Sequence, residues 1–131
     1  MSKPLTCTVA AATLLVASIP VHAQPADPLL GVWQSADASA TVRITPCDRG
    51  QFLCATKIAE KLEPGEKSEL GKVMVRDIRR NGNKGWIGQF DTDGQFIPAK
   101  IRQSGANSMS VKICALGFLC DTIKFVRLKS N

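Results

Sequence analysis

The chain has 131 residues, with 17 basic and 11 acidic side chains, a formal net charge of +6 and five cysteines. This length fits one modest domain and not two. With no tyrosine and a single histidine, His22, the chain has few residues for the commonest catalytic groups.

Residues 1–23 have the pattern of a cleaved signal peptide. Lys3 begins a short basic segment, residues 9–19 are apolar, and residues 21–23 (Val-His-Ala) form a small-x-small cleavage site. The apolar run is far shorter than the roughly 20 residues that cross a bilayer. We therefore expect a mature domain of residues 24–131, without a transmembrane segment, in the periplasm or secreted. Such compartments are oxidising. Cleavage of the signal peptide would also remove the only histidine, His22.

Short runs rich in valine, isoleucine and phenylalanine follow, separated by glycine, asparagine and aspartate. They predict eight strands, at residues 30–34, 40–45, 51–59, 72–80, 85–91, 95–103, 108–114 and 120–128. The alternation is clearest where Met109, Val111 and Ile113 share one face. Residues 60–70 are polar enough for a mobile loop. Consecutive hairpins predict an all-β antiparallel meander, and closure into a small up-and-down barrel would remove its two exposed edges.

Two residues at opposite ends of the chain support closure. Trp33 follows Gly31 and Val32 at the start of the first strand, and Arg127 lies near the end of the last. This pair resembles the lipocalin and calycin arrangement, in which a Gly-x-Trp tryptophan packs at the barrel base beneath an arginine of the final strand. The resemblance implies that Trp33 and Arg127 close the barrel.

A wider set of motifs covers the mature chain. In order they are Gly31-Val32-Trp33, Pro46-Cys47 with Leu53-Cys54, Gly85-Trp86-Ile87-Gly88, Asp91 to Gly94, and Cys114 to Cys120. The chain resembles a short member of the bacterial exported family called domain of unknown function 2147, which implies a lipocalin-like barrel and no established activity. Two features depart from that family: residues 60–70 replace an Asp/Asn-Pro segment, and Phe125 stands where tryptophan is commoner.

Four cysteines remain in the mature chain, and spacing alone allows three pairings. An odd number of strands separates the turn with Cys47 and Cys54 from the turn with Cys114 and Cys120, so the two turns should lie at opposite barrel ends. Antiparallel partners within each hairpin have Cα atoms about 4.5 to 5.5 Å apart, which suits a disulfide. We therefore expect a staple within each hairpin and no zinc or redox centre.

Catalytic and metal-binding patterns are scarce. Without histidine the mature chain has no Ser-His or Cys-His pair, so we expect no enzyme, no cofactor and no metal site. Asp91 and Asp93 fit turn chemistry. Asp77 follows Val73 and Val75 at alternate positions, and we expect it near the rim, paired with a neighbouring arginine.

The positive charge is mostly dispersed, with one denser group in the hairpin at residues 76–84. We expect weak contact of this hairpin with an anionic envelope surface, no nucleic-acid binding, and a monomer.

Two function classes remain. In the first, the barrel carries a small apolar or amphiphilic ligand. The cavity candidates are Trp33, Trp86, Gly88, Phe90, Met109 and Val111. Trp86 and Phe90 share a strand face, and Gly88 between them would either leave space for a ligand or relieve a bend where the sheet curls. In the second, a filled barrel acts as an interaction module of the cell envelope through its basic surface or residues 60–70.

Overall fold

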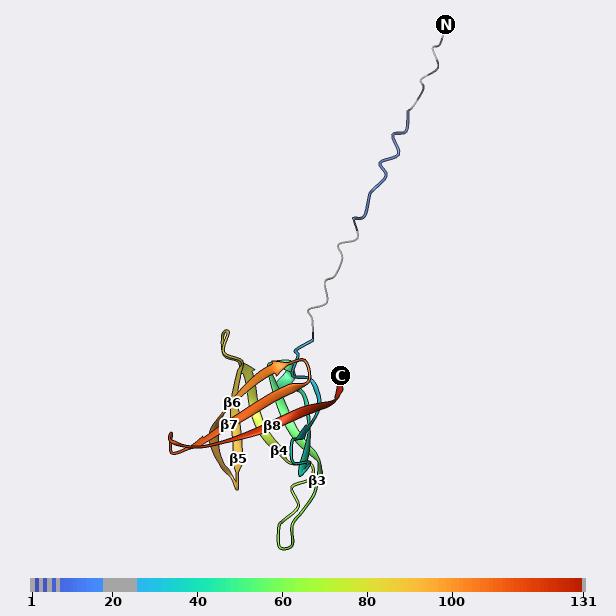
Figure 1. Ribbon diagram of the computed structural model, residues 1–131. Coiled ribbons are helices and arrows are strands. Elements are labelled where there is room, and N and C mark those ends of the chain that lie inside the picture. Colours follow the sequence, from blue (N-terminus) through green and yellow to red (C-terminus); the bar gives the residue numbers. More distant parts are fainter. Residues whose placement is uncertain (1, 3, 5, 7, 18–25, 131) are drawn as a thin grey trace.

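Eight antiparallel strands follow one another along the chain in the computed structural model (Figure 1). The structure describes residues 2, 4, 6, 8–17 and 26–130, with the backbone only for residues 129 and 130. The predicted signal-peptide cleavage site lies outside the described residues. The strands are β1 (Gly31–Ser35), β2 (Ala40–Cys47), β3 (Phe52–Glu60), β4 (Val73–Arg80), β5 (Trp86–Thr92), β6 (Gln95–Gly105), β7 (Ser108–Ala115) and β8 (Leu119–Ser130).

The meander closes into a barrel because β1 pairs with β8 as well as with β2. Trp33 lies opposite Arg127 in this closing ladder, and Gln34 lies opposite Val126. The predicted fold class, an eight-stranded antiparallel up-and-down barrel, is confirmed. The strand bounds differ from the prediction by a few residues at most.

Side-chain alternation produces one continuous core. On β7, Met109, Val111 and Ile113 are buried, whereas Lys112 between them is exposed. The alternation changes phase on β4, where the register against β5 shifts between Arg76 and Arg79. Asp77 lies in this bulge with a φ of 53°.

The bulge corrects the expectation for Asp77. Because it inserts a residue, Val75 and Ile78, three positions apart, are both buried. Among the described residues Asp77 forms no ion pair with a neighbouring arginine.

The barrel has two different ends. The end that we call the closed end carries residues 26–30 and the β2–β3, β4–β5 and β6–β7 turns, at the top of Figure 1. The open end carries the β1–β2, β3–β4, β5–β6 and β7–β8 connections. The β3–β4 connection is the long loop that hangs below the barrel in Figure 1.

Residues 26–30 cap the closed end through two tryptophans. The Trp33 indole nitrogen donates a hydrogen bond to the Leu29 carbonyl at 2.8 Å, and the Trp86 indole nitrogen donates to Asp27 Oδ2 at 3.2 Å. Leu29 and Trp33 are fully buried. The closed half of the barrel is therefore filled with side chains.

Each predicted disulfide is formed within its hairpin. Cys47 and Cys54 join β2 to β3, and Cys114 and Cys120 join β7 to β8. Their Cα atoms are 5.9 Å and 4.0 Å apart, respectively. The first staple lies at the closed end and the second at the open end, as the count of intervening strands predicts.

Candidate ligand-binding cavity

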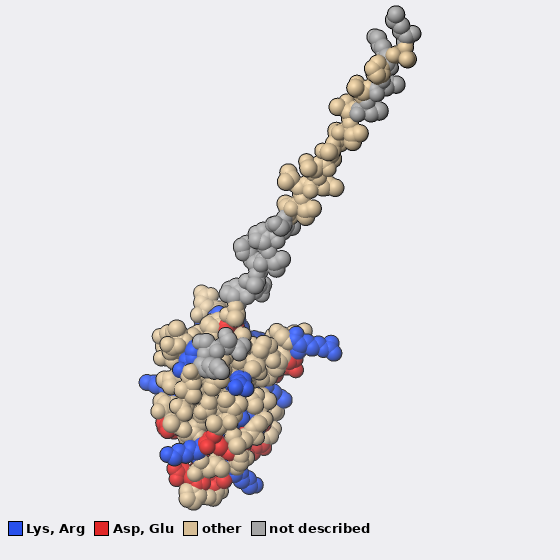
Figure 2. Space-filling view, turned by 90° about the vertical axis from the view of Figure 1, so that its right-hand side faces the viewer, with Lys and Arg blue, Asp and Glu red and all other residues tan. Residues whose placement is uncertain are grey.

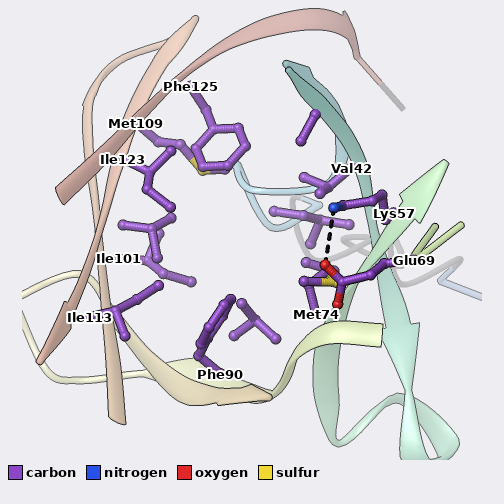
Figure 3. A pocket seen from close by; sticks show the side chains of 15 residues that line it. Val42, Lys57, Glu69, Met74, Phe90, Ile101, Met109, Ile113, Ile123 and Phe125 are labelled. Carbon is purple, nitrogen blue, oxygen red and sulfur yellow. Dashed lines mark ion pairs between the residues drawn. The ribbon is translucent and has the colours of Figure 1, made fainter. Parts of the chain in front are cut away.

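The open half of the barrel contains a cavity of about 250 Å³. Its wall comes from strands β2 to β8 and is almost entirely aliphatic, aromatic or thioether (Figure 3). The lining residues are Ala40, Val42, Ile44, Ala55, Lys57, Glu69, Met74, Val75, Phe90, Ile101, Met109, Val111, Ile113, Ile123 and Phe125. The space can therefore take an apolar molecule, and only two of its lining residues are charged.

Those two residues, Lys57 and Glu69, form an ion pair at the cavity wall. Lys57 Nζ lies 3.5 Å from Glu69 Oε1, the contact drawn as a dashed line in Figure 3. Lys57 follows Ala55 by two residues, so both side chains lie on the inward face of β3. The Lys57 side chain is only 14% exposed. A cation is thus held at the edge of an otherwise apolar space.

The ion pair belongs to a longer series of charges around the cavity mouth. Lys57 Nζ also lies 3.9 Å from Glu60 Oε2. Lys72 Nζ lies 3.0 Å from Glu69 Oε2 and 3.8 Å from Asp91 Oδ2. Acidic and basic groups alternate along this series, so each charge is partly compensated by its neighbours.

The backbone of the β3–β4 loop fixes Glu69 in place. The Gly71 amide donates to the Lys57 carbonyl at 2.8 Å, and the Lys57 amide donates to the Lys72 carbonyl at 3.0 Å. The Glu69 amide donates to Glu60 Oε2 at 3.0 Å, and the Ser68 hydroxyl donates to Glu60 Oε1. The end of the loop predicted to be mobile is therefore hydrogen-bonded to β3.

Hydrogen bonds at the cavity mouth lower the pKa of both Glu60 and Glu69. The Ser68 hydroxyl and then the Glu69 amide hold the pKa of Glu60 below its ordinary value of 4.5. The hydrogen bond from Lys72 is the main cause that lowers the pKa of Glu69, and the same bond raises the pKa of Lys72. Both carboxyl groups are negatively charged at neutral pH.

Three of the residues predicted for the cavity line it: Phe90, Met109 and Val111. The two tryptophans do not. Trp33 and Trp86 lie in the filled closed half, where their indole nitrogens bond to residues 26–30. Trp86 and Phe90 share a face of β5 as predicted, but at different depths of the barrel, so they do not line one site.

The space predicted beside Gly88 does not exist. A Cβ atom added to Gly88 would lie 2.9 Å from Val75 Cγ1 and 3.0 Å from both the Arg76 carbonyl oxygen and Ile78 Cγ1. The β4 bulge brings Val75 and Ile78 against this position. Gly88 therefore permits close approach of β4 and β5 and does not contribute to the cavity.

Sequence reasoning missed the charged mouth and part of the wall. The position of Lys57 in the cavity wall could have been predicted, because it follows Ala55 by two residues on the inward face of β3. The position of Glu69 could not have been predicted, since it lies in a loop whose sequence has no strand periodicity. The other wall residues that were not predicted for the cavity are Ala40, Val42, Ile44, Ala55, Met74, Val75, Ile101, Ile113, Ile123 and Phe125.

The basic hairpin at residues 76–84 has two of its arginines stacked on aromatic rings. The guanidinium carbon of Arg76 lies 3.5 Å from the centroid of the Phe96 ring, and that of Arg80 lies 4.1 Å from the Trp86 ring. These contacts place two cations against the barrel surface. Contact with an anionic envelope surface stays a prediction.

Within residues 2, 4, 6, 8–17 and 26–130, no group of three or more histidine, cysteine, aspartate or glutamate side chains is placed to hold a metal ion. The part of the chain that the structure describes has no helix long and apolar enough to cross a membrane. Comparison with protein-family models, curated proteins and solved structures finds no significant match. The resemblance to the exported family of unknown function therefore stays a prediction from the sequence motifs.

Proposed function

We propose that this protein is an exported, lipocalin-like barrel that binds a small apolar or amphiphilic molecule without catalysing a reaction. The observation that carries the proposal is the 250 Å³ cavity in the open half, whose wall is apolar except for Lys57 and Glu69. Burial of apolar ligand surface against such a wall is favourable by about 25 cal/mol per Å² before the costs of association.

The cavity volume limits the size of the ligand. An apolar protein cavity of roughly 150 Å³ takes one benzene molecule. A cavity of about 250 Å³ therefore suits a chain or ring system of about ten carbon atoms. Longer chains would have to extend through the mouth.

Export is supported by the two disulfides, because paired cysteines persist in oxidising compartments. The signal-peptide pattern of residues 1–23 points to the same destination. Determination of the N-terminal residue of protein recovered from the periplasm or the medium tests this part of the proposal, and cleavage before Gln24 is the expected result.

The alternative of an interaction module assumes that side chains fill the barrel. The filled closed half fits that assumption, but the cavity in the open half favours the carrier. The two functions differ in a direct measurement. Native mass spectrometry of the purified protein shows a retained ligand for a carrier and the bare mass for an interaction module.

Calorimetric titration with decan-1-ol, a neutral ten-carbon amphiphile, tests the site itself. The Val111→Phe variant places a larger side chain in the cavity and should weaken decanol binding about tenfold, or about 1.4 kcal/mol. Val126→Phe is the matched control, because Val126 is 44% exposed on β8 and does not line the cavity. Equal affinity of both variants, or failure of the parent protein to bind decanol, would contradict the carrier proposal.

A further inference from the structure

A polar hollow adjoins the apolar cavity at the open end. It lies between the β1–β2 turn and the β3–β4 loop and shares Ala40, Lys57 and Glu69 with the cavity. Its lining residues are Asp37, Ser39, Ala40, Lys57, Glu60, Lys61, Leu62, Glu63, Glu66, Lys67 and Glu69. The Lys57–Glu69 pair thus stands at the boundary between an apolar space and a charged one, the arrangement that an amphiphile requires.

The charge of this hollow is opposite to that of the whole chain. It has five carboxylates, from one aspartate and four glutamates, against three lysines, whereas the chain has a net charge of +6. In Figure 2 the acidic side chains, in red, gather mainly at the lower end of the face shown, which is the open end. An entering head group therefore meets a local surplus of negative charge.

At this boundary Oε1 is the less strongly bonded of the two Glu69 carboxylate oxygens. Its Oε2 atom accepts a hydrogen bond from Lys72 Nζ at 3.0 Å. Its Oε1 atom has Lys57 Nζ at 3.5 Å, beyond the about 2.7 to 2.9 Å of a charge-assisted hydrogen bond. A donor on a ligand can therefore bond to Oε1 without displacing Lys72.

We propose that the ligand is a cationic amphiphile, whose chain of about ten carbon atoms fills the cavity and whose ammonium group donates to Glu69 Oε1 at the edge of the polar hollow. This inference rests on the proposed carrier function. The ammonium group offsets part of the negative surplus of the hollow. A carboxylate head could pair with Lys57, but it would then lie beside Glu69, since the two side chains are only 3.5 Å apart. An ammonium group at Oε1 meets the corresponding repulsion from Lys57, so what distinguishes the two head groups is the surplus of carboxylates over lysines in the hollow, which favours the cation.

Three ligands with the same ten-carbon chain test the head group: decylamine, decan-1-ol and decanoate, each titrated calorimetrically at pH 7. An alkyl amine is protonated at this pH, as lysine is. We expect decylamine to bind about tenfold tighter than decanol, and decanoate to bind more weakly than decanol. A tenfold ratio corresponds to about 1.4 kcal/mol.

Two variants of the parent protein locate the effect, and a third serves as the control. Glu69→Gln should lower the ratio of decylamine affinity to decanol affinity about tenfold. Lys57→Met should strengthen decylamine binding, because it removes the cation that shares Glu69 Oε1. Asp48→Asn, in the β2–β3 turn at the closed end, removes one negative charge far from the hollow and should change the decylamine affinity less than twofold.

The outcomes separate the two proposals. If decanol binds and decylamine binds no tighter, or if decanoate binds tightest, the cationic head group is wrong and the carrier function stands. If Glu69→Gln also loses decanol binding, the Lys57→Met variant decides the question. Decylamine binding by Lys57→Met that is unchanged or weaker than that of the parent protein overturns the inference. If none of the three ligands binds the parent protein, the carrier function itself fails.

Discussion

Arg127 lies over Trp33 with its guanidinium carbon 4.2 Å from the centroid of the ring. The same guanidinium donates hydrogen bonds to three backbone carbonyls, those of Leu30 at 2.7 Å, Ala106 at 2.9 Å and Pro28. One side chain of β8 therefore binds residues 26–30, the β6–β7 turn and the tryptophan at the closed end. The pair expected from the sequence is in contact, and its role includes anchoring the cap.

Arg127→Lys tests that role. Lysine keeps the positive charge but cannot donate in three directions while stacking on the indole. Hydrogen bonds to charged groups contribute about 1.5 to 3 kcal/mol each, so the loss of two or more should lower the free energy of unfolding by about 3 kcal/mol. Urea denaturation measures the change. Arg102→Lys, on an exposed part of β6, is the control and should stay within about 0.5 kcal/mol of the parent protein.

Gly88→Ala should destabilise the barrel. The added methyl group meets Val75, the Arg76 carbonyl and Ile78 at about 3 Å, and overpacking of this kind costs about 1 to 3 kcal/mol. Thermal unfolding should show the loss. Gly105→Ala is the matched control on β6, since a Cβ atom there has no neighbour within 4 Å. A stable Gly88→Ala variant with weakened decanol binding would return Gly88 to the ligand site.

Replacement of either cysteine pair by serine should lower the free energy of unfolding by roughly 2.5 kcal/mol, because each disulfide closes a short loop in the unfolded chain. The sequence separations of 7 and 6 residues make the two losses nearly equal. Denaturant titration of the two double variants measures them. Non-reducing peptide mapping checks the pairing itself, and a peptide that links Cys54 to Cys114 would contradict it.

Asp37 makes the β1–β2 turn sensitive to acid. Hydrogen bonds from the hydroxyls of Ser35 and Ser39 and from the Ser39 amide lower the pKa of Asp37 to about 2 from 3.8. Because the folded value is the lower one, the stabilisation is fully present above about pH 4 and is lost as the pH falls through about 2.

The acid effect is measured by comparison of the parent protein with Asp37→Asn. The difference in their free energies of unfolding should be constant between about pH 5 and 7 and should shrink below about pH 4. The range from about pH 5 to 7, in which this difference stays constant, serves as the internal control. A difference that does not change down to about pH 2 would show that the carboxylate contributes nothing beyond the amide.

The strands and the staples could be predicted because they depend on local patterns. Alternation on β7 gives the buried face of Met109 and Val111, and the parity of the intervening strands places the two disulfides at opposite ends. The alternation of apolar and polar residues predicts which face of the sheet a side chain occupies, but not its position along the barrel axis. Trp86 and Phe90 share a face of β5, yet one packs in the filled half and the other lines the cavity.

The charged mouth could not be predicted, because its parts depend on backbone geometry without a sequence period. Glu69 reaches the cavity only because the loop end is hydrogen-bonded to β3 at Lys57. The filled space at Gly88 has a similar cause. The bulge at Asp77 changes which β4 residues face inward, and no residue pattern in Val73–Arg80 predicts the bulge.

The closing ladder joins β1 to β8, so the ring contains one interface between segments almost a hundred residues apart in sequence. Neighbouring hairpins can pair as soon as both strands exist, but this interface needs the last strand. Contacts between distant segments slow folding, because loop closure costs entropy before the contact stabilises the chain. Folding of the barrel is thus completed only after synthesis of β8, and until then the sheet keeps two unpaired edges.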